Sequence, residues 1–170
     1  MIRPHVTLIM AMTVDGKIAK SSGHFTDWTS KEDKQFFLAK TKDIGVVIMG
    51  KNTYNTFKRA LPNRLNVVLS RQGGNSVSGQ LEFSSASPRE LLENLAKRGY
   101  ERVALIGGAA VNGAFLRAGL IDEILLTIEP RTFGEGLNLF SGIDVDISLS
   151  LISIKKLNKD VFCLHYKIIQ

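Results

Sequence analysis

The sequence has little of what builds covalent or metal cross-links. It contains one cysteine, Cys163, and three isolated histidines, His5, His24 and His165. One cysteine excludes an internal disulfide. The lack of paired cysteine and histidine ligands excludes a zinc deaminase module, so we expect no metal site. Neither a charged and apolar leader nor a long apolar run is present, which predicts a cytoplasmic protein without a membrane segment.

Acidic residues are fewer than basic ones, with 16 aspartates and glutamates against 22 lysines and arginines, and the formal net charge is +6 at pH 7. The basic residues are scattered, without a basic block or a basic and aromatic stripe, so nucleic acid is not an expected partner. A scattered positive excess suits a small anionic ligand. The 170 residues, of which 44% are hydrophobic, fit one domain over 1–170 with a substantial core.

Strand-like and helix-like segments alternate along the chain, which predicts an α/β fold. We expect strands at 6–11, up to 49, at 65–70 and at 123–128, and helices at 30–41, 88–99 and 109–118. Ser87 and Glu90 form a capping box around Pro88, which marks one helix start. The Gly- and Ser-rich segments 14–27 and 71–79 predict loops. Period-two alternation on both sides of 158–160 predicts a closing antiparallel hairpin, and therefore a mixed sheet.

Two strand-to-helix turns have the composition of a phosphate-binding site. VVIMGKNTY at 46–54 and VALIGGAAV at 103–111 each place an apolar strand, then glycine, then a helix start. Backbone N–H groups at such a helix start are open to an anion. Two of these turns predict an extended, multiply phosphorylated ligand. The second turn is similar to half of the G-x-G-x-x-G dinucleotide fingerprint, without the acidic residue about 20 positions on that the NAD pattern requires.

The order of short motifs along the chain resembles dihydrofolate reductase. The motifs are W-x4-D at 28–33, MGKNTY at 49–54, LPNR at 61–64, VVLS at 67–70, IGG at 106–108, DEILLTIEP at 122–130 and FGEG at 133–136. DGK at 15–17 and GLIDE at 119–123 are similar to the reductase domain of riboflavin biosynthesis, which shares the fold and the use of NADPH. The resemblance implies a dihydrofolate reductase-like α/β fold: a central, mixed, mostly parallel sheet of about eight strands, with flanking helices and a C-terminal antiparallel hairpin.

Asp33 is the residue on which the implied chemistry depends. The resemblance implies an acid at this helix position that binds the ring nitrogens of a pterin and assists protonation while hydride passes from nicotinamide to the ring. An acid in an apolar pocket has a raised pKa, which suits both tasks. Two other interpretations stay open: Asp33 serves only in a capping box with Ser30, or Asp27 is the acid. Thr29 and Glu32 form an alternative box that leaves Asp33 free.

The same resemblance implies a substrate pocket around Asp33, with Thr127 as a second catalytic residue. The substrate-binding residues are Ile9, Ala11, Trp28, Phe37, Phe57, Leu61, Arg64 and Ile106. Phe37 is expected to stack on the ring, and Thr127 to hold the carboxylate and the ring amino group through a water. Arg64 matches the arginine that pairs with the glutamate α-carboxylate of folate. Core packing, an ordinary strand position and a solvated turn are the alternative explanations for these three residues.

The implied cofactor is NADPH, bound by the two strand-to-helix turns. The cofactor-binding residues are Ile18, Gly50, Lys51, Asn52, Thr53, Ser70, Arg71, Gly107, Gly108, Ala109, Ala110 and Val111. Lys51 and Arg71 match residues that bind a 2′-phosphate, which favours NADPH over NADH. Gly107 and Gly108 allow the backbone to approach the diphosphate closely, although tight packing alone also explains them. The chain departs from the family pattern at Asn112, where an aromatic residue is expected near nicotinamide.

These observations predict an NADPH-dependent oxidoreductase that reduces 7,8-dihydrofolate to 5,6,7,8-tetrahydrofolate. The first alternative is a 5-amino-6-(5-phosphoribosylamino)uracil reductase of riboflavin biosynthesis, over which Arg64 favours folate. The second is a non-catalytic dinucleotide-binding or dimerisation module, against which Asp33 argues. We also expect a homodimer, because the C-terminal hairpin alternates apolar residues that a second copy can bury.

Overall fold

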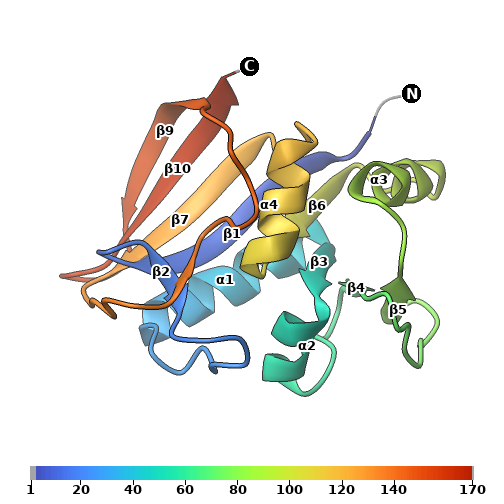
Figure 1. Ribbon diagram of the computed structural model, residues 1–170, viewed down its shortest axis with the longest axis horizontal. Helices are drawn as coiled ribbons and strands as arrows, with labels where there is room; N and C mark the ends of the chain where they lie inside the picture. The colour runs from blue at the N-terminus through green and yellow to red at the C-terminus, as the bar shows by residue number, and fades with distance from the viewer. Residues whose placement is uncertain (1–2, 170) are drawn as a thin grey trace.

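The computed structural model describes residues 3–169 and has an eight-stranded sheet at its centre (Figure 1). Its strand order is β5-β4-β3-β6-β1-β7-β10-β9. The strands are β1 (His5–Thr13), β3 (Val46–Gly50), β4 (Leu65–Leu69), β5 (Leu81–Ser84), β6 (Arg102–Leu105), β7 (Glu123–Glu129), β9 (Ser148–Lys156) and β10 (Phe162–Ile169). Strands from β5 through β7 pair in parallel, and β10 pairs antiparallel with β7 and β9. The predicted fold is therefore confirmed.

Helices cover both faces of this sheet. They are α1 (Lys31–Ile44), α2 (Lys51–Phe57), α3 (Pro88–Lys97) and α4 (Ala109–Arg117). Leu95 of α3 and Phe115 of α4 lie in one core cluster, and Phe37 of α1 and Phe57 of α2 pack against the other. Strands covered on both faces read as continuous apolar runs, and every residue of β3 is buried. No helix within residues 3–169 has the length and apolar character needed to cross a bilayer.

Short strands lie next to or inside segments predicted as loops. β2 (Lys17–Ala19) and β8 (Leu137–Asn138) pair in a separate two-stranded ribbon, and β5 follows the polar stretch 71–79. Strands this short show no alternating pattern, so composition does not mark them. The Asp15 carboxylate accepts hydrogen bonds from the N–H groups of Phe133 and Gly134, at 3.2 and 2.7 Å. Asp15 thereby joins the DGK segment to the FGEG segment.

The starts of two helices follow local capping chemistry. At α3, the Ser87 hydroxyl accepts a hydrogen bond from Glu90 N, and Ser87 N donates to Glu90 Oε2 at 2.9 Å, so the predicted capping box is confirmed. At α1, the N-cap is Ser30, whose hydroxyl accepts from Asp33 N at 3.1 Å. The alternative cap at Thr29 is therefore wrong, because the helix begins one residue later than that box requires.

Helix α1 ends about one turn later than predicted. Gly45 terminates it in the left-handed region, with a φ of 85°, and its N–H donates to Thr41 O at 3.1 Å. Glycine in this conformation is a common helix stop. The additional turn keeps Thr41 inside the helix, where its hydroxyl accepts a hydrogen bond from Arg64.

Candidate active site

The two strand-to-helix turns lie together at the carboxyl ends of the parallel strands. Gly50, at the end of β3, donates its N–H to Gly107 O at 2.8 Å. Thr53 of α2 lies against the second turn, since a Cβ on Gly108 would stand 3.3 Å from Thr53 Oγ1. Open α/β sheets bind ligands at this edge. The two predicted phosphate turns therefore form one continuous backbone surface.

This surface has no room for further side chains and leaves N–H groups unoccupied. A Cβ on Gly50 would come within 3.0 Å of Val111 Cγ2, and one on Gly107, whose φ is +98°, within 3.1 Å of Met10 Sδ. The Gly107–Gly108 peptide bond is cis. Neither α2 nor α4 has a side-chain cap or an acidic residue in its first turn. The first N–H groups of α4 are available to an anion, so the site fits the diphosphate of a dinucleotide cofactor.

The remaining predicted cofactor residues are distributed along the same edge. Lys51 begins α2 and is half-buried, whereas Arg71 follows β4 and is exposed. Because β3 and β4 are adjacent, these two cations follow neighbouring strand ends. Ile18 is half-buried on β2. The others lie in the turns or in the first turns of α2 and α4: Asn52, Ser70, Ala109, Ala110 and Val111.

Asp33 lies in the first turn of α1, and only 7% of it is exposed. Burial raises the pKa of its carboxyl group, the nearby hydroxyls of Thr127 and Thr29 lower it, and the charge of Glu129 raises it. Thr127 is on β7, level with Ala11 of β1. The two predicted catalytic residues are thus side by side. A buried acid with a raised pKa can bind a heterocycle and deliver a proton to it.

Two buried polar atoms in the segment before α1 have no hydrogen-bond partner within residues 3–169, namely Trp28 Nε1 and Thr29 Oγ1. Thr29 is close enough to Asp33 to affect its pKa, yet makes no well-formed hydrogen bond. Trp28 meets Phe133 edge-on, with ring centroids 5.1 Å apart. Unpaired buried donors are costly unless a ligand or water satisfies them, so they indicate a polar ligand here. Asp27, the rival acid, is exposed and lies outside this apolar setting.

The apolar residues predicted for the substrate pocket gather on the α1 side of the sheet. Phe37 and Phe57 stack with their centroids 6.2 Å apart and their planes 10° from parallel. The buried members of the same cluster include Ile9, Leu61 and Ile106. Ala11 is half-buried on β1. The structure therefore brings these residues into one apolar cluster that contacts both α1 and α2.

Arg64 is buried in the turn before β4, with 7% of it exposed. Its Nε donates to Pro62 O at 3.0 Å, and its Nη1 donates to Leu38 O at 3.3 Å and to the Thr41 hydroxyl. Nη2 donates to no residue within 3–169, and it is not sealed from solvent. One edge of the guanidinium is therefore open to a ligand carboxylate or phosphate.

Two polar residues that the motifs did not identify shape this site. Asn66 is fully buried in β4, where its Oδ1 accepts from Leu61 N at 2.9 Å and its Nδ2 donates to Arg64 O at 3.0 Å. It thereby holds the turn that carries Arg64. Glu129 is 3% exposed at the end of β7 and accepts two hydrogen bonds from Ser30, each at 2.8 Å. A polar residue within a buried apolar strand is the signal that could have marked both.

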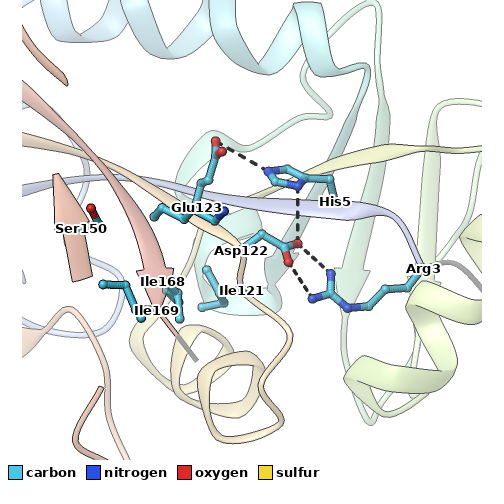
Figure 2. Close-up of a pocket in the computed structure, with 9 residues that line it drawn as sticks. Arg3, His5, Ile121, Asp122, Glu123, Ser150, Ile168 and Ile169 are labelled. Atoms are coloured by element: carbon cyan, nitrogen blue, oxygen red, sulfur yellow. Dashed lines mark hydrogen bonds and ion pairs between the residues drawn. The ribbon is translucent and has the colours of Figure 1, made fainter. Parts of the chain in front are cut away.

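A large cavity lies at the other end of the sheet, where β1 and β7 begin. Figure 2 shows this cavity, about 760 Å³ in volume. Arg3 and Asp122 form a bidentate pair there at 2.7 Å, and His5 and His165 approach Glu123 at 3.6 and 2.9 Å. No three metal-ligating side chains form a metal site here or elsewhere within residues 3–169. Because these charges pair with one another, away from the carboxyl edge, this cavity is not the candidate site.

Comparison with solved structures defines the class of this molecule. The chain superposes on a dihydrofolate reductase of Enterococcus faecalis, solved with NADP(H), with a TM-score of 0.70 and 26% sequence identity, over 98% of this chain and 97% of that one. The molecule is a dihydrofolate reductase-like α/β protein.

Comparison of sequences gives the family. Residues 4–163 match the model of the RibD C-terminal domain, and the chain belongs to that family. It is 30% identical to a "Putative dihydrofolate reductase" of Caenorhabditis elegans over 91% of this chain and 82% of that protein. It is 26% identical to the 2,5-diamino-6-ribosylamino-4(3H)-pyrimidinone 5′-phosphate reductase of Methanothermobacter thermautotrophicus, over 85% and 87%. These relatives are reductases, so the predicted oxidoreductase class and the family resemblance are confirmed.

Proposed function

We propose that the chain is an NADPH-dependent reductase of riboflavin biosynthesis that acts on a phosphoribosylated aminopyrimidine in the cytoplasm. The family match and the archaeal relative, which aligns over most of both chains, favour this alternative over dihydrofolate, the substrate predicted first from the sequence. The observation that carries the proposal is Asp33, a buried carboxyl with a raised pKa. Adjacent residues of β1 connect it to the phosphate turns: Met10 lies against Gly107, and Ala11 is level with Thr127.

The site supplies the protein's share of a hydride-transfer reaction. Bound NADPH supplies a hydride to a carbon of the substrate, and a proton must reach the nitrogen bonded to it. The first N–H groups of α4 hold the diphosphate, and Lys51 and Arg71 are the cations for a 2′-phosphate. Asp33 binds the ring edge and assists the proton, and the unpaired Trp28 Nε1 donates to the ligand or to a bound water.

The shape of a carboxylate favours one form of the aminopyrimidine. A 2-aminopyrimidin-4-one ring presents two adjacent donors, the ring N–H and the 2-amino group, which match the two oxygens of Asp33. A uracil ring has a carbonyl where this amino group stands. We therefore place 2,5-diamino-6-ribosylamino-4(3H)-pyrimidinone 5′-phosphate, the compound for which the archaeal relative is named, ahead of 5-amino-6-(5-phosphoribosylamino)uracil.

Dihydrofolate is the second candidate substrate, and Arg64 is the observation that favours it. Its pterin ring has the same pair of donors, and its glutamate tail has an α-carboxylate. The open Nη2 edge of Arg64 suits such a carboxylate. The similarity to the nematode protein also supports this substrate.

Oxidation of NADPH by the purified protein, followed by the loss of absorbance of the reduced cofactor, separates these possibilities. The diaminopyrimidinone, the aminouracil and dihydrofolate are assayed in parallel, and we expect the highest kcat/KM with the diaminopyrimidinone. A higher value with dihydrofolate would favour the second candidate. No turnover with any of the three would contradict a reductase and leave a dinucleotide-binding module. Asp27→Asn, a change at an exposed acid, is the control for Asp33→Asn.

We also propose a homodimer formed through the outer face of the C-terminal hairpin. β9 is the edge strand, and Figure 1 shows no helix in front of it. Leu149, Leu151 and Ile154 are 41%, 49% and 58% exposed, and each is paired with an apolar or aromatic residue of β10. Such a continuous apolar face on the surface is typical of an interface.

The charges at the two ends of this strand favour a second copy as the partner. Asp144 and Asp146 precede β9, and Lys155 and Lys156 end it, and all four are exposed. When two copies pack antiparallel about a twofold axis, the acidic end of each meets the basic end of the other. The same arrangement places apolar residues against apolar residues along the middle of the strand.

A further inference from the structure

The first turn of α1 is capped by a residue outside the helix. Ser30 N and Ser30 Oγ both donate to Glu129 Oε1 at 2.8 Å, and Ser30 Oγ accepts from Asp33 N at 3.1 Å. At α3 the same pattern is internal: Ser87 N and Oγ donate to Glu90 Oε2 at 2.9 and 2.7 Å, and Ser87 Oγ accepts from Glu90 N at 3.4 Å. In a capping box the third helical residue supplies the carboxylate. In α1 that residue is Asp33, and Glu129 occupies its place.

We propose that Glu129 is a positioning residue for the reaction: by capping α1 from β7, it releases the Asp33 carboxyl from the helix end and holds it beside Thr127. This inference rests on the proposed function, in which Asp33 is the acid. It accounts for a residue at a capping-box position whose carboxyl faces the hydroxyls of Thr127 and Thr29.

The geometry of β7 makes this role direct. Thr127 and Glu129 are two residues apart on one strand, so their side chains point to the same side of the sheet. Both are buried, with 2% and 3% exposed. The hydrogen bonds from Ser30 to Glu129 therefore fix the start of α1 against the same strand that presents Thr127. Small displacements of a reacting group cost large factors in rate, which gives such a link functional weight.

Glu129 also acts on Asp33 through its charge. The titratable groups that face Asp33 are Glu129 from β7, Lys34 from α1 and Cys163 from β10. Glu129 raises the pKa of Asp33 and Lys34 lowers it. Burial raises the pKa of the Cys163 thiol, which keeps that group neutral. Removing the charge of Glu129 therefore lowers the pKa of Asp33, and the proton-donating form of Asp33 is then lost at a lower pH.

The test compares two substitutions of Glu129 with a matched control. Glu129→Gln keeps an oxygen that can accept from Ser30 but removes the charge, whereas Glu129→Ala removes both. Glu32→Gln is the control, because Glu32 lies in the same helical turn and accepts from Asn158 at 3.0 Å. The titration of the Asp33 carboxyl carbon is followed by ¹³C NMR in the full chain without substrate. The pH profiles of kcat and KM are measured with the three substrates named above.

We expect Glu129→Gln to titrate Asp33 at lower pH than the wild type, while its kcat on the acidic side stays within about threefold. Glu129→Ala should lose kcat by roughly tenfold or more at every pH, because Asp33 then turns to cap Ser30. Glu32→Gln should leave both readouts unchanged.

A wild-type titration of Asp33 in Glu129→Gln, or a wild-type kcat in Glu129→Ala, would overturn the inference. If Glu129→Ala does not fold, the titration in Glu129→Gln decides the question alone. The NMR readout needs no substrate, so it still tests Glu129 if the wild-type protein reduces none of the three compounds. Failure of the proposed function and failure of this inference are therefore distinguishable.

Discussion

The ionisation of one residue, Asp33, links stability to pH. Its pKa is raised in the folded protein, chiefly by burial, above the ordinary value of 3.8. Folding therefore favours its protonated form. The stability that follows from this proton is complete below the unfolded pKa and is lost as the pH rises through the folded pKa.

Asp33→Asn should therefore be more stable than the wild type at mildly alkaline pH, because it removes a buried charge and keeps the shape. The difference should shrink as the pH falls toward the ordinary pKa of an aspartate. Urea denaturation at a series of pH values measures this, and Asp27→Asn, at an exposed position, is the control. A stability difference that grew toward acidic pH would contradict the raised pKa.

Arg64 offers a second prediction for a single residue. Arg64→Lys keeps the charge and loses the planar fork that suits a carboxylate. We expect the KM for dihydrofolate to rise by about tenfold or more, and the KM for the aminopyrimidine, which has no glutamate, to change less. Steady-state assays with both substrates measure this, with Arg59→Lys at an exposed position as the control. An equal rise for both substrates would remove the glutamate contact from the account.

Individual residues could be predicted from sequence only where a motif included them. Asp33 and Thr127 belong to matched motifs, and the structure places them together. Glu129 was missed because its partner, Ser30, is 99 positions away, and no local spacing records that contact. Asn66 bonds only five positions back, yet its role depends on the turn geometry at 61–64. Tertiary hydrogen bonds of this kind become visible only in the fold.

Secondary-structure elements were predictable where their signals are local. The capping box at α3 is confirmed because four consecutive residues specify it. The C-terminal hairpin is confirmed because β9 and β10 are long enough for alternation to show. β2 and β8 were missed because two short segments far apart in sequence stabilise each other through Asp15. The end of α1 was placed too early because Gly45, the stop signal, was not used.

The cap of α3 gives a prediction for a whole element. Ser87→Ala removes the hydroxyl that accepts from Glu90 N, and should lower the free energy of unfolding by about 0.5–2 kcal/mol. Chemical denaturation measures the change. Ser85→Ala is the matched control, since Ser85 is exposed and outside the helix, and should stay within about 0.5 kcal/mol of the wild type. An equal loss in both variants would show that the cap contributes nothing specific.

At the scale of the whole molecule, the sheet is covered unevenly. Helices bury both faces of its centre, while β9 lies at one edge with all nine residues exposed (Figure 1). An edge strand with an apolar face is prone to associate. This asymmetry could be anticipated from the alternation in the tail, although only the observed strand order shows that β9 is an edge.

Leu151→Glu should convert the proposed homodimer to a monomer, because it places a charge on the apolar face of β9. Ser153→Glu is the matched control: Ser153 pairs with His165 and not with the apolar residues of β10, so this variant should remain dimeric. Sedimentation velocity at micromolar concentration distinguishes the two species. A monomeric wild type, or a Leu151→Glu variant that still dimerises, would contradict the interface.

The most direct test of the central claim is the pH dependence of NADPH oxidation by the wild type and by Asp33→Asn, with the diaminopyrimidinone as substrate. The account predicts a wild-type rate that falls as the pH rises through the raised pKa of Asp33. It predicts that Asp33→Asn is about 10²–10⁴-fold slower, loses that pH dependence and binds NADPH with unchanged affinity. An Asp33→Asn variant with the rate and pH profile of the wild type would contradict it.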